Sequence, residues 1–196
     1  MRRLGVLIVL LAATVGCTST VAGQPAAEPA SADSATSEIV LPPRPYELRV
    51  DGVDPCALLT PDQRSELGLD GRPIPYASET RFFVGRACSI GGYRPRAIGT
   101  NIVLVTGNDL QALIDVTPDA AVPQELSVVA VADFPGVVSR SEIVSFCSVS
   151  VDVADDQFVN IIFADDGEQQ PIPQDQLCQE AMIVAEQALQ TLKNGT

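Results

Sequence analysis

The sequence predicts an α+β domain in which an antiparallel sheet is covered by helices. Segments with the pattern of short strands are grouped between residues 88 and 163, and a helical segment closes the chain at 175–193. Strands grouped in this way and followed by a helix are typical of α+β folds rather than of alternating α/β units. Residues 46–196 number about 150, which is enough for one domain with its own core.

The first expected element is a short helix at residues 60–67. Thr60 can cap its start, Pro61 suits the first helical position, and Gln63 completes a capping-box pattern. Gly68 is expected to end it.

The strand pattern is clearest at residues 145–153, where Cys147, Val149, Val151 and Val153 alternate with polar residues. Alternation with a period of two is typical of a strand that buries one face. The acidic pair that follows this segment predicts a turn into a further strand. The expected strands are 88–93, 100–106, 125–131, 136–140, 145–153 and 157–163, with a helix at 108–115.

The closing helix is predicted by one apolar stripe. Cys178, Met182, Ala185, Leu189 and Leu192 recur at intervals of three and four residues, so they fall on one helical face. Cys178 is therefore expected to point into the core from the first turn.

The chain begins with the layout of a bacterial secretory signal peptide. Two arginines follow Met1, and an apolar run of about 12 residues leads to small residues just before Cys17. A transmembrane helix would need about 20 apolar residues. Residues 14–17 resemble a lipoprotein box, which implies cleavage after residue 16 and a lipid on Cys17. We expect residues 1–16 to be a signal peptide and the mature protein to be lipid-anchored on the extracytoplasmic face of the cell membrane, with plain secretion as the alternative.

Residues 17–45 are expected to form a linker between this lipidated cysteine and a folded domain at 46–196. The stretch from Thr18 to Ser37 is almost entirely Ala, Ser, Thr, Pro and Gly, and a proline-rich segment follows it. Too few large apolar side chains are present to offset the entropy cost of ordering the chain.

The charge of the chain is strongly negative. Removal of residues 1–16 leaves ten basic residues against 25 acidic ones, a net charge of −15. This balance excludes nucleic acid as an expected partner and disfavours docking of the folded domain on anionic lipid. Five arginines between residues 72 and 96 could pair with the acidic half of the domain or hold an anionic ligand.

Four cysteines remain once Cys17 carries a lipid. An even number in an exported protein indicates two disulfides. A zinc site is disfavoured, because the gaps of 32, 59 and 31 residues lack paired spacings and the chain has no histidine. We favour the pairs Cys88–Cys147, between strands, and Cys56–Cys178, between helix starts; four cysteines allow three connectivities, so the other two stay open.

Several of these segments carry a resemblance to an actinobacterial lipoprotein family known only as a domain of unknown function. Its members share a lipoprotein signal, a low-complexity stalk, and motifs that here read Asp54-Pro55-Cys56-Ala57-Leu58-Leu59-Thr60, Cys147-Ser148-Val149-Ser150-Val151 and Cys178-Gln179-Glu180-Ala181. The chain departs from the family at its central strand, where Cys88-Ser89-Ile90 stands in place of Cys-x-Trp. The resemblance implies an exported domain and brings no established activity.

No catalytic or cofactor motif is present in the sequence. Without histidine, a serine–histidine triad or a histidine metal cluster is impossible. Two acidic groups in expected turns are the remaining candidates for glycoside hydrolysis or calcium binding, although neither fits the EF-hand spacing. They are Asp152, Asp155 and Asp156 in one turn and Asp165, Asp166 and Glu168 in the other.

The sequence therefore predicts a non-enzymatic lipoprotein without cofactor or metal, which binds a protein, lipid or wall component at the cell envelope. A carboxylate-dependent enzyme and a structural wall spacer are the alternatives. By analogy, the order of elements looks similar to the small sandwiches of the Mog1/PsbP type.

Overall fold

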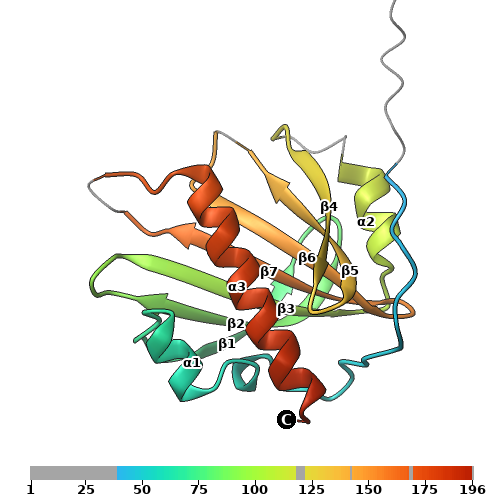
Figure 1. Ribbon diagram of the computed structural model, residues 1–196, viewed down its shortest axis with the longest axis horizontal. Coiled ribbons are helices and arrows are strands. Elements are labelled where there is room, and N and C mark those ends of the chain that lie inside the picture. The colour runs from blue at the N-terminus through green and yellow to red at the C-terminus, as the bar shows by residue number, and fades with distance from the viewer. Residues whose placement is uncertain (1–38, 118–121, 142, 168–169, 196) are drawn as a thin grey trace, which may run out of the picture. The chain divides into compact units, whose positions relative to one another are not determined.

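The protein folds around one antiparallel sheet of seven strands. The structure, a computed structural model, describes residues 39–117, 122–141, 143–167 and 170–195. The strand order is β1-β2-β3-β7-β6-β5-β4 (Figure 1). The strands are β1 (Ile74–Glu79), β2 (Val84–Gly92), β3 (Ile98–Thr106), β4 (Glu125–Val131), β5 (Phe134–Arg140), β6 (Phe146–Ala154) and β7 (Gln157–Asp165).

Helices lie on both faces of this sheet. The long helix α3 (Gln174–Lys193) crosses one face over β6 and β7, and the short helix α2 (Leu110–Val116) lies on the other (Figure 1). A 3-10 turn, η1 (Pro55–Ala57), packs on β2, and helix α1 (Pro61–Glu66) follows it. The expected α+β architecture with an antiparallel sheet is thus confirmed.

The larger core lies between α3 and the sheet. The helix buries a stripe that includes Ala181, Ala185 and Ala188, whose small side chains let the helix approach the strands closely. The facing sheet residues are β-branched or aromatic, among them Val149, Val151 and Phe163 at 0% exposure. The expected stripe on the closing helix is confirmed at Ala185, Leu189 and Leu192, whereas Cys178 and Met182 are only partly buried at its edge.

The predicted helices and strands match the structure closely, with one strand missing from the prediction. The capping box at the start of α1 is present, because Thr60 accepts from the Gln63 backbone and Gln63 accepts from the Thr60 backbone. The unpredicted strand is β1, at an edge of the sheet. Five of its six residues are exposed, so its sequence carries no buried alternation that could reveal it.

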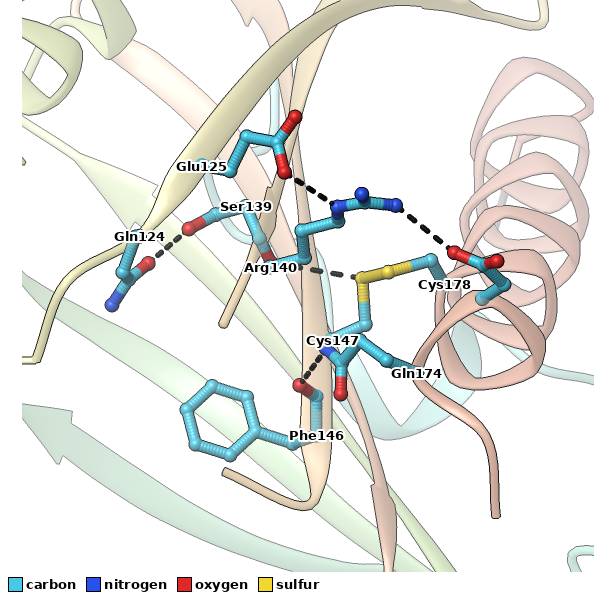
Figure 2. The surroundings of a disulfide bond; sticks show 9 residues. Gln124, Glu125, Ser139, Arg140, Phe146, Cys147, Gln174 and Cys178 are labelled. Atoms are coloured by element: carbon cyan, nitrogen blue, oxygen red, sulfur yellow. Dashed lines mark hydrogen bonds and ion pairs between the residues drawn. A yellow bond between two sulfur atoms is a disulfide. The ribbon is translucent and has the colours of Figure 1, made fainter. Parts of the chain in front are cut away.

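The four cysteines form two disulfides, as expected, but the favoured pairing is wrong. The bonds are Cys56–Cys88 and Cys147–Cys178, with Cα–Cα distances of 5.1 and 4.9 Å, and Figure 2 shows the second of them. Both Cys88 and Cys147 face α3, yet β3 and β7 separate their strands. Three strand spacings amount to about 14 Å, beyond the Cα–Cα reach of a disulfide. Each cysteine of the sheet is instead bonded to the helical segment above it.

Each disulfide closes a short loop, whereas the expected Cys56–Cys178 bond would have closed a long one. The sequence separations are 32 and 31 residues, and each bond stabilises the fold by about 3–4 kcal/mol in the chain-entropy treatment. At the second bond, the start of α3 is held further by Gln174, which donates to the carbonyl of Phe146 at 2.8 Å (Figure 2).

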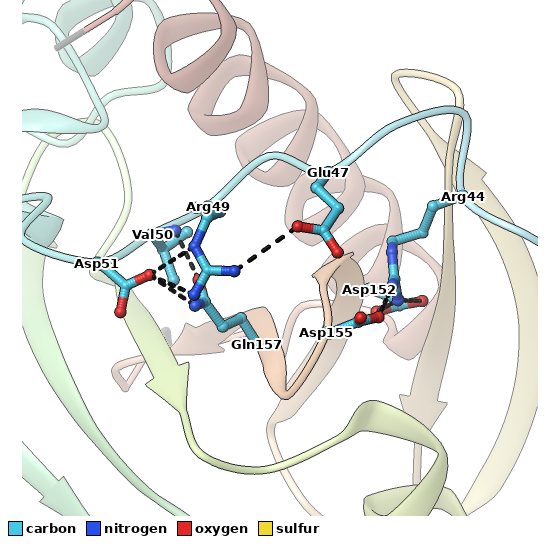
Figure 3. A network of polar contacts seen from close by, with 8 residues as sticks. All are labelled: Arg44, Glu47, Arg49, Val50, Asp51, Asp152, Asp155 and Gln157. Carbon is cyan, nitrogen blue, oxygen red and sulfur yellow. Dashed lines mark hydrogen bonds and ion pairs between the residues drawn. The ribbon is translucent and has the colours of Figure 1, made fainter.

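Packing of the chain on the sheet begins earlier than the expected domain boundary at residue 46. Ile39 and Leu41 pack against the smaller core on the α2 face, and Arg44 pairs with two aspartates (Figure 3). The prediction of a linker over residues 17–45 is therefore corrected for its last seven residues. Residues 1–16 and Cys17 lie outside the described part of the chain. Over the described residues, none of the helices has the length and apolar character required to cross a membrane.

Trypsin digestion without reduction provides a test of the disulfide pairing. No lysine or arginine lies between Arg140 and Lys193, so peptide 141–193 contains both Cys147 and Cys178. Mass spectrometry should find this peptide separate from all others and two hydrogens lighter than its reduced form, because its disulfide is internal. It should also find peptide 50–64 joined to peptide 87–96 by the Cys56–Cys88 bond. A peptide 141–193 bonded to either of the others would contradict the structure.

Candidate functional site

A cavity of about 160 Å³ lies on the α2 face of the sheet. Its walls come from four strands, from α2, and from the β1–β2 turn. The apolar lining is formed by Phe82, Phe83, Leu113, Ile114, Leu126, Val137, Phe146 and Ile162. The polar lining is formed by Thr117, Gln124, Ser139, Ser148, Ser150 and Asn160. A mostly apolar concavity with a few converging polar groups is the usual form of a small-molecule site.

The floor of the cavity comes from the strand alternation that the sequence shows. Ser148 and Ser150 alternate with residues of the α3 core, so their side chains point to the opposite face. In register, Ser150 pairs with Asn160 and Ser148 with Ile162. The sequence predicts a strand buried on one face only, but Ser150 is 5% and Asn160 4% exposed. Side chains from α2 and the β1–β2 turn cover this face as well.

Asn160 is the central polar group of the floor. Its Nδ2 donates to the hydroxyls of Ser148 and Ser150, both at 2.8 Å. Its Oδ1 is buried and accepts no hydrogen bond from any described residue. A buried acceptor without a partner costs about 1–3 kcal/mol. Such a group within a cavity wall has a vacant hydrogen-bonding position.

A tight turn places two phenylalanines over this floor. The Thr80 hydroxyl accepts from the backbone N–H groups of Phe82 and Phe83, at 3.1 and 3.0 Å. Phe83 packs edge-on against Phe158 of β7, with ring centroids 5.4 Å apart. Arg81 lies over the ring of Phe82 at 4.4 Å from its centroid. The turn geometry and the aromatic contact together fix one wall of the cavity.

The wall formed by α2 is joined to the N-terminal end of the described chain. Gln111 on α2 donates to the carbonyl of Ile39 at 2.8 Å and accepts from the backbone N–H of Leu41 at 3.4 Å. Asp109 caps α2 by accepting from the Gln111 backbone at 2.6 Å. The chain thus reaches the domain beside the cavity wall.

Arg44 fixes the next part of this segment to the β6–β7 turn (Figure 3). One guanidinium nitrogen donates to both carboxylate oxygens of Asp152 at 2.7 Å, and the other donates to Asp155. Burial raises the pKa of Asp152 above its ordinary value, although the hydrogen bonds from Arg44 oppose the rise. Arg49 makes a separate, exposed group with Glu47 and Asp51.

The two predicted acidic groups lie at opposite ends of β7. Asp152, Asp155 and Asp156 are at the β6–β7 turn, whereas Asp165 and Asp166 end the strand. Nine residues of strand separate them by about 30 Å, so carboxylates of the two turns cannot act on one bond. Asp165 accepts from the backbone of Gly167 and Ile172 and so organises its own loop. Glu168 lies outside the described residues.

Three of the five arginines between residues 72 and 96 have partners within the domain. Arg81 lies over the ring of Phe82. Arg86 donates to the carbonyl of Val50 at 3.3 Å, and Arg96 pairs with Glu180 of α3 at 2.9 Å. Within the described ranges, no group of three or more acidic, histidine or cysteine side chains is arranged to hold a metal ion.

Sequence reasoning missed Asn160, although a signal for it exists. It is an amide in the middle of an otherwise apolar strand segment, from Phe158 to Phe163. A polar residue at such a position needs a hydrogen-bonding partner. The loop phenylalanines carry no comparable signal, because their place over the floor depends on the fold of the β1–β2 turn.

A comparison with protein-family models matches most of the chain to one family. A family model described as "Protein of unknown function (DUF3558)" matches residues 12–191. The chain belongs to this family. The match runs from residue 12 through the folded domain, and it confirms the prediction of a domain of unknown function. No curated protein and no solved structure matches the chain.

Loss of the Arg44 contact should loosen this DUF3558 domain at its N-terminal segment. We expect Arg44→Gln to lower the free energy of unfolding by about 1–2 kcal/mol, because the largely buried Asp152 loses its charged donor. Urea denaturation at neutral pH measures the change.

Arg49→Gln is the matched control for this experiment. Its side chain is 57% exposed, so the free energy of unfolding should change by less than about 0.5 kcal/mol. Equal effects of the two substitutions would contradict the assignment of Arg44 as the structural contact.

Proposed function

We propose that the protein is a lipid-anchored binding module of the cell envelope, which holds a small molecule in the cavity on the α2 face. The cavity is the observation that carries the binding role, because it combines apolar walls with a buried polar group that lacks a partner. The proposal refines the predicted partner, left open as a protein, lipid or wall component, to a small ligand.

The signal layout at the start of the chain supports the anchor. In this proposal residues 1–16 are removed and Cys17 carries the lipid, and residues 17–38 form the tether to the domain. Fully extended, these 22 residues cover up to about 75 Å. The tether joins the domain at Ile39, close to α2. The predicted placement on the extracytoplasmic face of the membrane is retained in this proposal.

A binding role without catalysis is favoured by the chemistry of the described residues. The cavity is lined by neutral side chains only, so it offers neither a general base nor a charged electrophile among the described residues. The nearest alternative, a carboxylate enzyme, would have to use the turn at 152–156, where Asp152 and Asp155 are both bound to Arg44. A Mog1/PsbP-like topology remains our proposal for the relationship of the fold.

The anchor is tested by substitution of Cys17 in an actinobacterial host. We expect Cys17→Ala to lose the lipid mass and to leave the membrane fraction for the medium, or to accumulate with its signal uncleaved. Fractionation and intact mass spectrometry measure both results. Thr18→Ala, at the next residue, should remain in the membrane with its lipid. A mature, unlipidated Cys17→Ala protein that stays in the membrane would contradict the anchor.

The binding role is tested by native mass spectrometry of the full chain isolated from the same host. We expect an additional mass of up to a few hundred daltons that is lost on denaturation, because the cavity has room for a small molecule only. A bare protein mass in repeated preparations, together with no response to added small molecules, would contradict the proposal.

A further inference from the structure

We propose that the cavity selects a neutral, ring-sized apolar group that carries one hydroxyl, whose polar end meets Ser148, Ser150 and Asn160. This inference rests on the proposed function and adds the chemical class of the ligand. It follows from the volume of the cavity, from the incomplete hydrogen bonding of its floor, and from the lack of charge in its described lining.

The volume limits the enclosed part of the ligand to about the size of one ring. An apolar protein cavity of about 150 Å³ holds benzene. The cavity here has a volume of about 160 Å³, so a six-membered ring with one or two further atoms fits. A complete acyl chain is too large to be enclosed in this volume.

Two buried amides on β7 differ in how fully they are hydrogen-bonded. An unpaired buried amide oxygen also occurs away from the cavity, at Gln187 Oε1 on α3, so the vacancy alone does not mark the site; its place in the cavity floor does. Gln157 is 3% exposed and uses both ends of its amide, accepting from the Val50 backbone at 2.8 Å and donating to Asp51 at 2.7 Å. Asn160 is 4% exposed but uses only its nitrogen. Gln157 therefore fills a structural role, whereas Asn160 retains an acceptor for a donor that the described residues do not supply.

The serines of the floor add the complementary capacity. Each hydroxyl accepts from Asn160 Nδ2, and a hydroxyl that accepts still has its own proton to donate. The floor can thus offer two donors and, once a small shift of the Asn160 side chain uncovers its buried Oδ1, one acceptor. A ligand hydroxyl, which both donates and accepts, matches this set better than a group that only accepts.

The lining also selects against charge. None of the described residues that line the cavity is ionisable in the physiological range. A charged ligand group buried there would lose its hydration without gaining a counter-ion, which is strongly unfavourable. We therefore expect discrimination against carboxylates as well as against purely apolar rings.

Four small probes test this selectivity on the full chain by NMR titration of the backbone amides. Phenol supplies a ring with a donor and acceptor, toluene has the same shape without hydrogen bonding, anisole only accepts, and benzoate is charged. We expect phenol to bind about tenfold more tightly than toluene or anisole, the ratio that one hydrogen bond supplies. Benzoate should bind most weakly.

Substitutions then locate the effect. Asn160→Leu should reduce phenol affinity about tenfold and leave toluene affinity within about twofold. Asn101→Leu is the matched control: Asn101 lies on neighbouring β3, bonds to Tyr76, and does not line the cavity. The Asn101→Leu variant should bind phenol with unchanged affinity. Ser150→Ala is the second variant should Asn160→Leu fail to fold, and it should also reduce phenol selectivity over toluene.

The outcomes separate this inference from the proposed function. If toluene or anisole binds in the cavity as tightly as phenol, the hydroxyl preference is wrong. The proposed binding role would then stand, with a ligand of another chemical class. Tightest binding by benzoate would overturn the neutral class. No shift at the cavity with any probe would overturn both the inference and the binding role. Phenol preference that is lost in Asn160→Leu and kept in Asn101→Leu supports the inference.

Discussion

The pairing of β3 with β7 is the contact on which the rest of the structure depends. The chain forms two antiparallel sequences of neighbouring strands, β1–β3 and β4–β7, and this one ladder joins them. It is continuous from Ile98 opposite Asp165 to Thr106 opposite Gln157. Each disulfide lies within one of the two halves, so neither crosses the junction. Strand pairing and burial under α3 must therefore hold the halves together.

The cavity exists because of this junction. Its phenylalanine wall belongs to the β1–β2 turn of the first half, and its serine floor belongs to β6 of the second. The position of Asn160 follows from the same register, since it stands between Val103 of β3 and Ser150 of β6. A shift of the β3–β7 register by one residue would turn the strands of the first half over relative to Asn160, because β6 and α3 hold β7 in the second half.

Local patterns predicted most of the fold because each element carries its own signal. The alternation around Cys147 and the stripe ending at Leu192 specify which face of each element is buried, without reference to neighbours. The disulfide pairing required the order of strands in the sheet, which no local pattern contains. The pairing of Cys88 with Cys147 failed for this reason, since both residues face the same core from strands that are not adjacent.

The candidate site was less accessible from sequence than the fold. Ser148 and Ser150 read as the solvent side of a strand, because nothing near them in sequence indicates that α2 and the β1–β2 turn cover that side. Asn160 could have been singled out as an isolated amide in an apolar strand. Its difference from Gln157, however, depends on partners more than 100 residues away for Gln157, and only the folded structure supplies them.

The segment from Ile39 to Val50 connects the cavity wall to the opposite core. Gln111 holds its start on α2, Arg44 holds it at the β6–β7 turn, and Val50 ends in the core beneath α3. In the proposed anchored protein, the tether continues from the start of this segment, so a pull on the tether reaches α2 before it reaches the α3 core. Because α2 also forms one wall of the cavity, the entry of the chain into the domain and the candidate site share this helix.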